Sequence, residues 1–327
     1  MDSLLLRRKI LQAASGGEPA ADNILTFIAE EANSTIKLAK RGSGSFPVIS
    51  LQYSTNGGRT WEAYTIDSTI TLARVGHSVK FKGENSSFAS SEHVYYYFQM
   101  TGKIAASGDV TSLINGVGGD VDLTGKNYCF CRIFYNCTAL TQAPNLPSTK
   151  ISNYCYAHMF EGCTSLTGAP NLPAMTIADY CYYYTFYNCS ALTTVPTVLP
   201  ATTLAKSCYA NMFYSCISLT NAPALPATEL SISCYSNMFN GCSSLTTAPE
   251  LLAITLAKSC YVYMFAGCTN LNYIKAMFTT TPGISYTDSW VQGVSQTGTF
   301  IKNSAASWNV TGNSGIPSDW TVQTASE

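Results

Sequence analysis

Charged residues are scarce in this sequence. Asp, Glu, Lys and Arg make up 11% of its 327 residues, whereas about a quarter is usual in globular domains. The formal net charge is −1, so the sequence lacks the basic excess with which nucleic-acid-binding proteins hold phosphates. We therefore expect no nucleic-acid partner, and a surface dominated by uncharged polar side chains.

Histidine is rarer still, and motifs for catalysis or cofactor binding are missing. His77, His93 and His158 lie in unrelated contexts, without the positioned nucleophile and acid that covalent catalysis requires. His158 falls at an outward position of its segment and is expected at the surface. A Gly-rich stretch at 116–119 is not followed by Gly-Lys-Ser/Thr, so it is not a phosphate-binding loop. We predict no catalytic residues, no cofactor and no enzymatic activity.

Long apolar runs are absent as well. The sequence has no stretch of about 18 apolar residues, so we expect no membrane span. Near the start, Arg7, Arg8 and Lys9 follow three leucines, whereas a secretory signal places its charges before an apolar run. No cysteine precedes Cys129, which argues against a lipid anchor there. Residues 2–14 favour a short helix that docks onto a larger assembly, the alternative being a frayed terminus.

Cysteine, in contrast, is abundant and regularly spaced. Twelve of the thirteen cysteines form pairs eight residues apart in six related copies of Cys-Tyr-x-x-Met-Phe-x-x-Cys. Successive copies are 26 residues apart, with one step of 27, and their first cysteines are Cys129, Cys155, Cys181, Cys208, Cys234 and Cys260. A fixed period of this size predicts stacked copies that share one hydrophobic core.

Each copy is expected to combine a short helix with an extended rung. Between Cys155 and Cys163 the apolar residues lie at offsets 0, 1, 4, 5 and 8, which matches helical spacing. The following Leu-Thr-x-Ala-Pro-x-Leu-Pro pattern excludes helix, because proline lacks a backbone donor. A strand-like rung fits that part better.

These residues carry a resemblance. Tyr-Cys-Tyr-x-x-Met-Phe-x-x-Cys, a leucine three residues later and Ala-Pro-x-Leu-Pro-Ala-Thr resemble the BspA-like leucine-rich-repeat family over about residues 127–278. That family includes surface proteins of anaerobic gut bacteria and of the phages that infect them. The resemblance implies adhesion or recognition without naming a ligand.

The predicted fold class is α+β, with an N-terminal immunoglobulin-like β-sandwich, a leucine-rich-repeat solenoid of about six 26-residue repeats, and a C-terminal cap. Seven short alternating segments separated by Gly, Asn and Ser predict the sandwich. A run at 297–302 suggests a hairpin within the cap. The expected regions are 1–17 (docking helix or tail), 18–103 (sandwich), 104–126 (linker and N-cap), 127–278 (solenoid) and 279–327 (cap, with Trp290, Trp308 and Trp320).

The cysteine spacing favours buried free thiols over disulfides. Two cysteines eight residues apart on a helix are separated by about 12 Å, which is too far to bridge. Equivalent cysteines of neighbouring copies could come within range, so occasional bridges remain the alternative. Zinc sites need clustered ligands, and the closest approach to one is Cys129 with Cys131. We predict no metal.

One motif resembles an element of sialidases. Ser54-Thr55-Asn56-Gly57-Gly58-Arg59-Thr60-Trp61 is similar to the Asp-box, with Asn56 where the aspartate belongs. An Asn-Gly pair of this kind predicts a hairpin turn. Glycosidase chemistry needs a pair of carboxylates, which the sequence does not offer convincingly. We interpret the motif as a structural turn.

Two surfaces are candidates for recognition. The first is a rung face of short polar residues beside the buried Leu and Ala, although threonine there also simply favours strands: Thr141, Gln142, Asn145, Thr167, Asn171, Thr193, Thr194, Thr220, Asn221, Thr246, Thr247 and Glu250. The second is a tyrosine face, since aromatic residues are enriched at interfaces: Tyr135, Tyr183, Tyr184, Tyr187, Tyr214 and Tyr263.

The predicted function is non-enzymatic recognition or adhesion. We expect the protein to be displayed on a phage virion, as a tail or capsid appendage, and to bind a host cell-surface glycan or protein through the repeats. Other virion proteins would be contacted through the N-terminal region. The alternatives are a purely structural virion or scaffold protein, and a bacterial adhesin at the cell surface or secreted. Homo-oligomer formation is left open.

Overall fold

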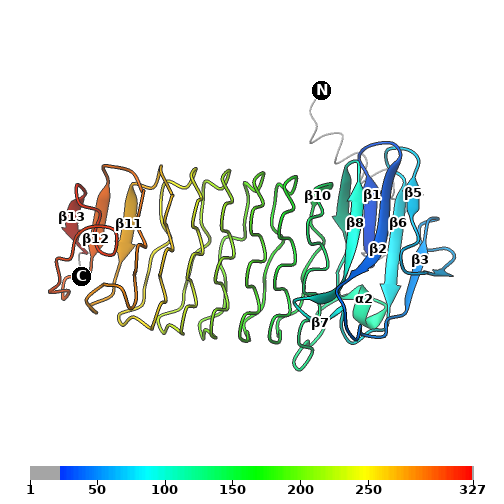
Figure 1. Cartoon of the computed structure of the whole chain (residues 1–327), viewed down its shortest axis with the longest axis horizontal. Helices are drawn as coiled ribbons and strands as arrows, with labels where there is room; N and C mark the ends of the chain where they lie inside the picture. Colours follow the sequence, from blue (N-terminus) through cyan, green and yellow to red (C-terminus); the bar gives the residue numbers. More distant parts are fainter. Residues whose placement is uncertain (1–22, 326–327) are drawn as a thin grey trace.

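The computed structural model describes residues 23–325. Two sheets at the N-terminal end are followed by a long row of similar coils (Figure 1). The predicted docking helix or tail at 1–17 lies outside the described residues.

The N-terminal part is built from two sheets packed face to face. One has the strand order β10-β9-β1-β6-β3-β4 and the other β5-β2-β8-β7. Their bounds are β1 Leu25–Ala29, β2 Ser34–Arg41, β3 Leu51–Ser54, β4 Glu62–Ala63, β5 Ile70–Leu72, β6 Ser78–Gly83, β7 Ala89–Ser91, β8 Val94–Thr101, β9 Ile104–Ser107 and β10 Leu140–Gln142. The sheets meet through aromatic rings: Phe98 of β8 lies 4.9 Å from Phe27 of β1 and 5.4 Å from Phe81 of β6.

The strand order differs from that of an immunoglobulin domain. There the last strand pairs with the strand before it. Here β9 leaves β8 and pairs antiparallel with β1 in the opposite sheet. Its other edge pairs in parallel with β10, which belongs to the first repeat. The first sheet therefore continues directly into the repeats.

The N-terminal sheets also close the core of the repeats. The Phe98 ring stacks on Phe134 at 5.5 Å, and Phe88 stacks on Phe130 at 6.1 Å. The Phe98 N–H donates to Ile133 O at 2.8 Å. These contacts cover the first copy, and one hydrophobic core runs from the sheets into the repeats.

The predicted α+β class, with an immunoglobulin-like sandwich and a leucine-rich-repeat solenoid, is wrong. Strands account for 24% of the residues and helix for 1%, in several small sheets that do not form a solenoid. Within residues 23–325 the helix is the four-residue α2, Ser112–Asn115, which precedes the first repeat. The segments between paired cysteines, which were expected to be helical, are series of tight turns.

Left-handed residues explain why these segments are not helices. Tyr154, His158 and Gly162 have φ of 55°, 55° and 74°, and equivalent positions recur in the other copies. An L-residue in this conformation interrupts a right-handed helix. The segment therefore repeats every four residues. This period places offsets 0, 4 and 8 on the same side. Accordingly Cys155 and Cys163 are both fully buried.

The backbone hydrogen bonds of these turns alternate between two directions. Ala157 N donates to Tyr154 O within the turn at 3.2 Å, whereas Tyr156 N donates to Cys181 O of the next copy at 2.9 Å. The same alternation continues along each copy. The extended parts join through isolated parallel bridges such as Gly168 with Thr194. Neighbouring copies thus lie side by side and in register.

Identical buried side chains meet across each interface between copies. One ladder of phenylalanine rings has neighbouring centroids 5.3 to 5.9 Å apart: Phe134, Phe160, Phe186, Phe213, Phe239 and Phe265. A second ladder holds Tyr156, Tyr182, Tyr209, Tyr235 and Tyr261. Stacked rings contribute beyond their burial alone, so each copy is stabilised mainly by its two neighbours.

The C-terminal region continues the parallel arrangement. Strands β11 Tyr273–Ala276, β12 Thr299–Lys302 and β13 Thr321–Thr324 form one parallel sheet. The hairpin expected at 297–302 is therefore wrong. Trp290, Trp308 and Trp320 are buried, and the Trp290 ring lies 6.2 Å from Tyr261 of the last ladder.

All thirteen cysteines are buried free thiols. The second cysteine of a copy donates to a carbonyl of the preceding copy, as from Cys163 Sγ to Phe134 O at 3.1 Å and from Cys189 Sγ to Phe160 O at 3.1 Å. Burial raises the pKa of Cys260 and of Cys268 to about 12. Since the thiolate is the reactive form, these thiols are inert in the folded protein.

We expect no thiol of the native protein to react with Ellman's reagent near neutral pH, because all of them are buried. All thirteen should react once the chain is unfolded in concentrated guanidinium chloride without reductant. The measurement is absorbance of the released thionitrobenzoate. A count below thirteen in denaturant would reveal disulfides and contradict the prediction.

Candidate functional site

The rung face is largely exposed. Eleven of its twelve predicted residues are exposed: Gln142, Asn145, Thr167, Asn171, Thr193, Thr194, Thr220, Asn221, Thr246, Thr247 and Glu250. Thr141 is the exception, since it is buried, with its hydroxyl 2.7 Å from Glu30 Oε2 and 3.2 Å from Ile104 O. Thr141 therefore anchors the first copy to the N-terminal sheets and is not available to a ligand.

Several rung-face side chains already make hydrogen bonds between copies. Thr193 Oγ1 donates to Thr167 O at 3.1 Å, and Glu250 forms an exposed ion pair with Lys275 at 3.1 Å. Their remaining lone pairs still face solvent. A hollow of about 420 Å³ lies beside this face, lined by Thr197, Ala222, Ala224, Leu225, Pro226, Pro249, Glu250 and Leu252. The surface thus offers hydrogen-bonding groups next to apolar ones.

The tyrosine face is only partly assembled as predicted. Tyr183, Tyr184, Tyr187 and Tyr214 form a continuous cluster, with neighbouring ring centroids 4.4 to 5.0 Å apart. Tyr135 instead packs against Tyr95 of β8 at 6.2 Å. Tyr263 is 37% exposed and contacts no ring of a described residue. The predicted face is therefore a cluster with two outlying members.

Another tyrosine ladder on the same side was not predicted from the sequence. Tyr128, Tyr154 and Tyr180 stack with centroids 4.8 and 4.7 Å apart, and the Lys206 ammonium lies 5.4 Å from the Tyr180 ring. The available signal was a tyrosine immediately before the first cysteine in the first three copies, where later copies have serine. These tyrosines extend the cluster toward the N-terminal sheets.

His158 is not at the surface, so that prediction is wrong. It is 7% exposed, and its ring nitrogens lie 2.5 Å from Glu161 Oε2 and 2.9 Å from Glu92 Oε1. The ring also stacks on Tyr184 at 5.1 Å. The cause is the loop between β7 and β8, which carries Glu92 over the second copy. The loop thereby ties the N-terminal sheets to the repeats.

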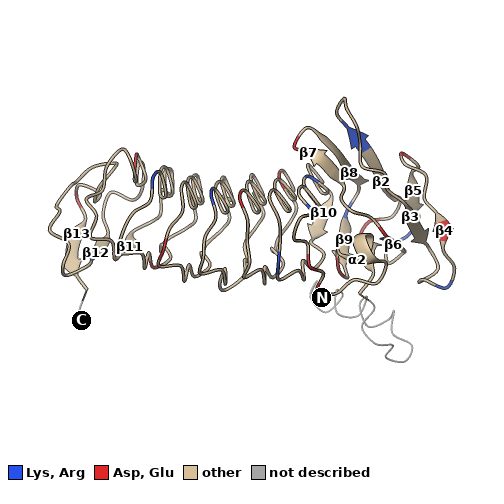
Figure 2. Cartoon of the chain, turned by 90° about the horizontal axis from the view of Figure 1, so that it is seen from below, with Lys and Arg blue, Asp and Glu red and all other residues tan. Residues whose placement is uncertain are grey.

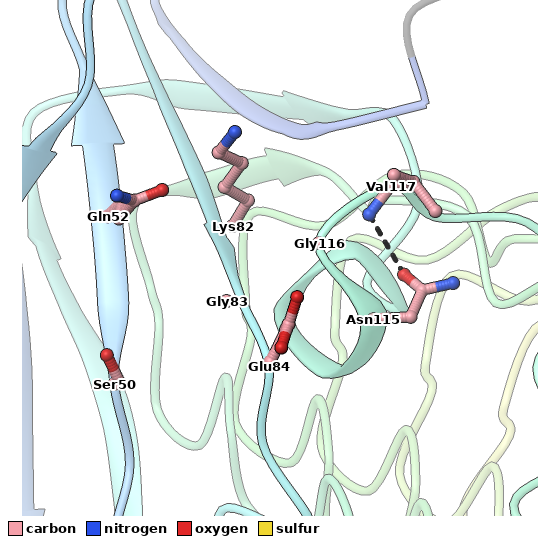
Figure 3. A pocket seen from close by; sticks show the side chains of 8 residues that line it. All are labelled: Ser50, Gln52, Lys82, Gly83, Glu84, Asn115, Gly116 and Val117. Carbon is pink, nitrogen blue, oxygen red and sulfur yellow. Dashed lines mark hydrogen bonds between the residues drawn. The ribbon is translucent and has the colours of Figure 1, made fainter.

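A polar hollow of about 510 Å³ lies on the N-terminal part, between β3, β6 and the end of α2 (Figure 3). Its lining residues are Ser50, Gln52, Lys82, Gly83, Glu84, Asn115, Gly116 and Val117. Beside it the buried Asn85 amide binds Ser50 N at 2.7 Å and Leu113 O at 2.7 Å, which joins β3 to α2. The lining has one ammonium and one carboxylate but no nucleophile paired with a base.

No family model, curated protein or solved structure matches this chain. The resemblance to the BspA-like family accordingly stays a prediction.

The Asp-box-like motif forms a turn, as its residues indicated. Asn56 Oδ1 accepts from Thr60 N at 3.1 Å, and Ser54 Oγ accepts from Gly58 N at 2.9 Å. Its polar groups thus bind one another.

Across residues 23–325 there is no cluster of three or more His, Cys, Asp or Glu suited to a metal ion. In the same part of the chain, no helix has the length and apolar character needed to cross a membrane.

The Glu92–His158 contact makes stability depend on pH. The hydrogen bond from His158 holds the pKa of Glu92 below its ordinary value of 4.5. A carboxyl group with a lowered pKa stabilises the fold above pH 4.5, and this contribution is lost as the pH falls through the folded-state pKa. We expect Glu92→Gln to lower the free energy of unfolding by about 1–2 kcal/mol at neutral pH.

The difference between Glu92→Gln and the native protein should shrink below pH 4.5. Urea unfolding at neutral and acidic pH measures it. The matched control is Glu84→Gln, which alters an exposed carboxylate outside any ion pair among the described residues. If Glu92→Gln lowers the free energy of unfolding equally at both pH values, the charge of the carboxylate does not contribute to stability.

Proposed function

We propose that this protein recognises a ligand without chemical turnover, by binding a glycan or a protein of a host cell surface through the rung face. The observation that supports this is the exposure of eleven short polar side chains outside the hydrophobic core. They recur from copy to copy, so they offer hydrogen-bonding groups at regular steps. Charged side chains are sparse along the repeats (Figure 2), which favours a ligand bound by hydrogen bonds over one bound by charge.

A phage virion is the setting that we propose for this activity, with a bacterial surface or secreted adhesin as the alternative. Its support is the family resemblance.

A structural role in an assembly is favoured by a different observation, the tyrosine cluster around Tyr184. Tyrosine is enriched where proteins bind one another, so we expect this cluster to form a protein–protein interface in such an assembly, in addition to contacts through the N-terminal region.

Substitution of the rung face tests the proposed function. We expect the full-length protein to bind specific glycans on an array, or intact host cells. Thr220→Lys combined with Thr246→Lys should weaken that binding at least tenfold, about 1.4 kcal/mol, because the longer side chains block close approach. Biolayer interferometry on the selected glycan, or flow cytometry on cells, measures the loss.

The matched control is Thr228→Lys, because Thr228 is an exposed threonine outside the rung face. All variants should keep the urea midpoint of the native protein. The proposal fails if no glycan or cell is bound. It also fails if the double variant binds as well as the control.

A further inference from the structure

A second hollow lies where the N-terminal sheets meet the first repeat. It has a volume of about 330 Å³, and its lining residues are Arg41, Gly42, Glu92, His93, Tyr95, Arg132 and Tyr135. We call it the junction hollow. Arg41 ends β2, Tyr95 is on β8, and Arg132 and Tyr135 belong to the first turn segment. Both parts of the protein therefore contribute to it.

Arg132 is held firmly but keeps unused donors. Its Nε donates to Glu92 O at 2.9 Å and one Nη donates to Glu161 Oε2 at 3.4 Å. A guanidinium has five N–H donors, so three have no partner among the described residues. The group lies 4.6 Å from the Tyr135 ring and 5.5 Å from the Tyr95 ring, and 15% of its side chain is exposed.

The carboxylates nearest the junction hollow are already engaged. Glu92 hydrogen-bonds with His158, and Glu161 with His158 and Arg132. Arg41, by contrast, is exposed and forms no ion pair with a described residue. The hollow therefore presents the guanidinium of Arg41 and the free donors of Arg132, which is paired with Glu161, and its one lining carboxylate, Glu92, is held by His158. This charge pattern fits an anionic ligand.

The repeat itself does not require an arginine at this position. The equivalent residues in later copies are His158, Tyr184, Asn211, Asn237 and Tyr263. All have positive φ, with 61° at Arg132, and asparagine tolerates that conformation better than a long side chain. Arg132 is thus a departure from the repeat pattern at the point where the hollow forms.

We propose that the junction hollow binds the carboxylate of an acidic sugar residue. Guanidinium groups bind carboxylates through paired hydrogen bonds, and the free donors of Arg132 are available for this. The partly exposed Tyr135 ring lies beside the guanidinium and offers an apolar wall for the body of the sugar, whereas Tyr95 is buried and supports the guanidinium. This site is separate from the rung face and does not depend on the ligand bound there.

Titration of the full-length protein with small sugars tests the proposal. The probes are N-acetylneuraminic acid and galacturonic acid, with N-acetylmannosamine and galactose as neutral counterparts. Saturation-transfer NMR detects binding and isothermal titration calorimetry measures its strength. We expect at least one acidic sugar to bind tenfold or more tightly than its neutral counterpart, and its affinity to fall as salt is raised.

Matched variants locate the site. Arg132→Gln should weaken binding of the acidic sugar at least tenfold, and Arg41→Gln, which alters an exposed side chain, should weaken it severalfold without affecting folding. Lys206→Gln is the control, because that ammonium lies on the tyrosine ladder outside the hollow. The rung-face double variant should bind acidic sugar normally, which separates this proposal from the proposed function.

The proposal is overturned if neither acidic sugar binds at millimolar concentration, or if neutral sugars bind equally well. It is also overturned if Arg41→Gln and Arg132→Gln bind as the native protein does. Should Arg132→Gln fail to fold, Arg41→Gln and Arg41→Glu decide the question, since both must weaken binding and the charge reversal must do so more strongly.

Discussion

Phe186→Ala should lower the free energy of unfolding by about 3–5 kcal/mol, the usual loss for a buried phenylalanine. The ring is fully buried and stacks on Phe160 at 5.3 Å and on Phe213 at 5.6 Å. Its removal therefore leaves a cavity in contact with two neighbouring copies. Urea unfolding followed by circular dichroism measures the change in midpoint.

Tyr263→Ala is the matched control for that experiment. Tyr263 also lies on a turn segment, but it is 37% exposed and makes no ring contact with a described residue. Its loss should change the free energy of unfolding by no more than about 0.5 kcal/mol. Equal effects of the two substitutions would mean that the phenylalanine ladder is not the core of the repeats.

Ser233→Pro should be as damaging, at about 3 kcal/mol or more. Ser233 has φ of 55°, and its N–H donates to Lys258 O of the next copy at 2.9 Å. Proline fixes φ near −65° and removes that donor. The variant thus loses both the left-handed turn and one bond between copies, and its urea midpoint should fall accordingly.

Ser233→Gly gives the sharper test, because its sign depends on the backbone conformation. Glycine inside a helix is destabilising by about 0.5–1 kcal/mol relative to alanine. At a left-handed position it instead relieves a strain of about 1–2 kcal/mol. We expect Ser233→Gly to unfold at a higher urea concentration than the native protein. A lower midpoint would argue for a helical segment at this position.

The sequence was sufficient to predict the period, the shared core and most of the exposed rung face. Offsets 0, 1, 4, 5 and 8 are, however, compatible with periods of both 3.6 and four residues. The residues between them separate the two, since Gly162, Gly241 and Gly267, at offset 7, and Asn211 and Asn237, at offset 3, are residue types that tolerate the positive φ found there. Glycine and asparagine at these offsets indicate turns in place of a helix.

Other features depend on contacts between distant segments and could not be predicted. Glu92 is 66 residues from His158 in the chain, and the periodic pattern does not indicate that a loop of the N-terminal sheets covers the second copy. The burial of Thr141 has the same origin, because β10 pairs with β9. The junction hollow likewise arises from residues that no local motif connects.

The near-identity of the copies has a consequence for how the chain finds its fold. A copy that docked one unit out of place would still meet matching phenylalanine and cysteine side chains, so the ladders alone do not determine neighbour order. Thr185 stands where most copies have methionine, and its buried hydroxyl donates to Tyr156 O at 3.0 Å. Thr185 and the single 27-residue step therefore distinguish the copies around them from the others. A copy that paired one position out of register would lose these specific contacts and be less stable.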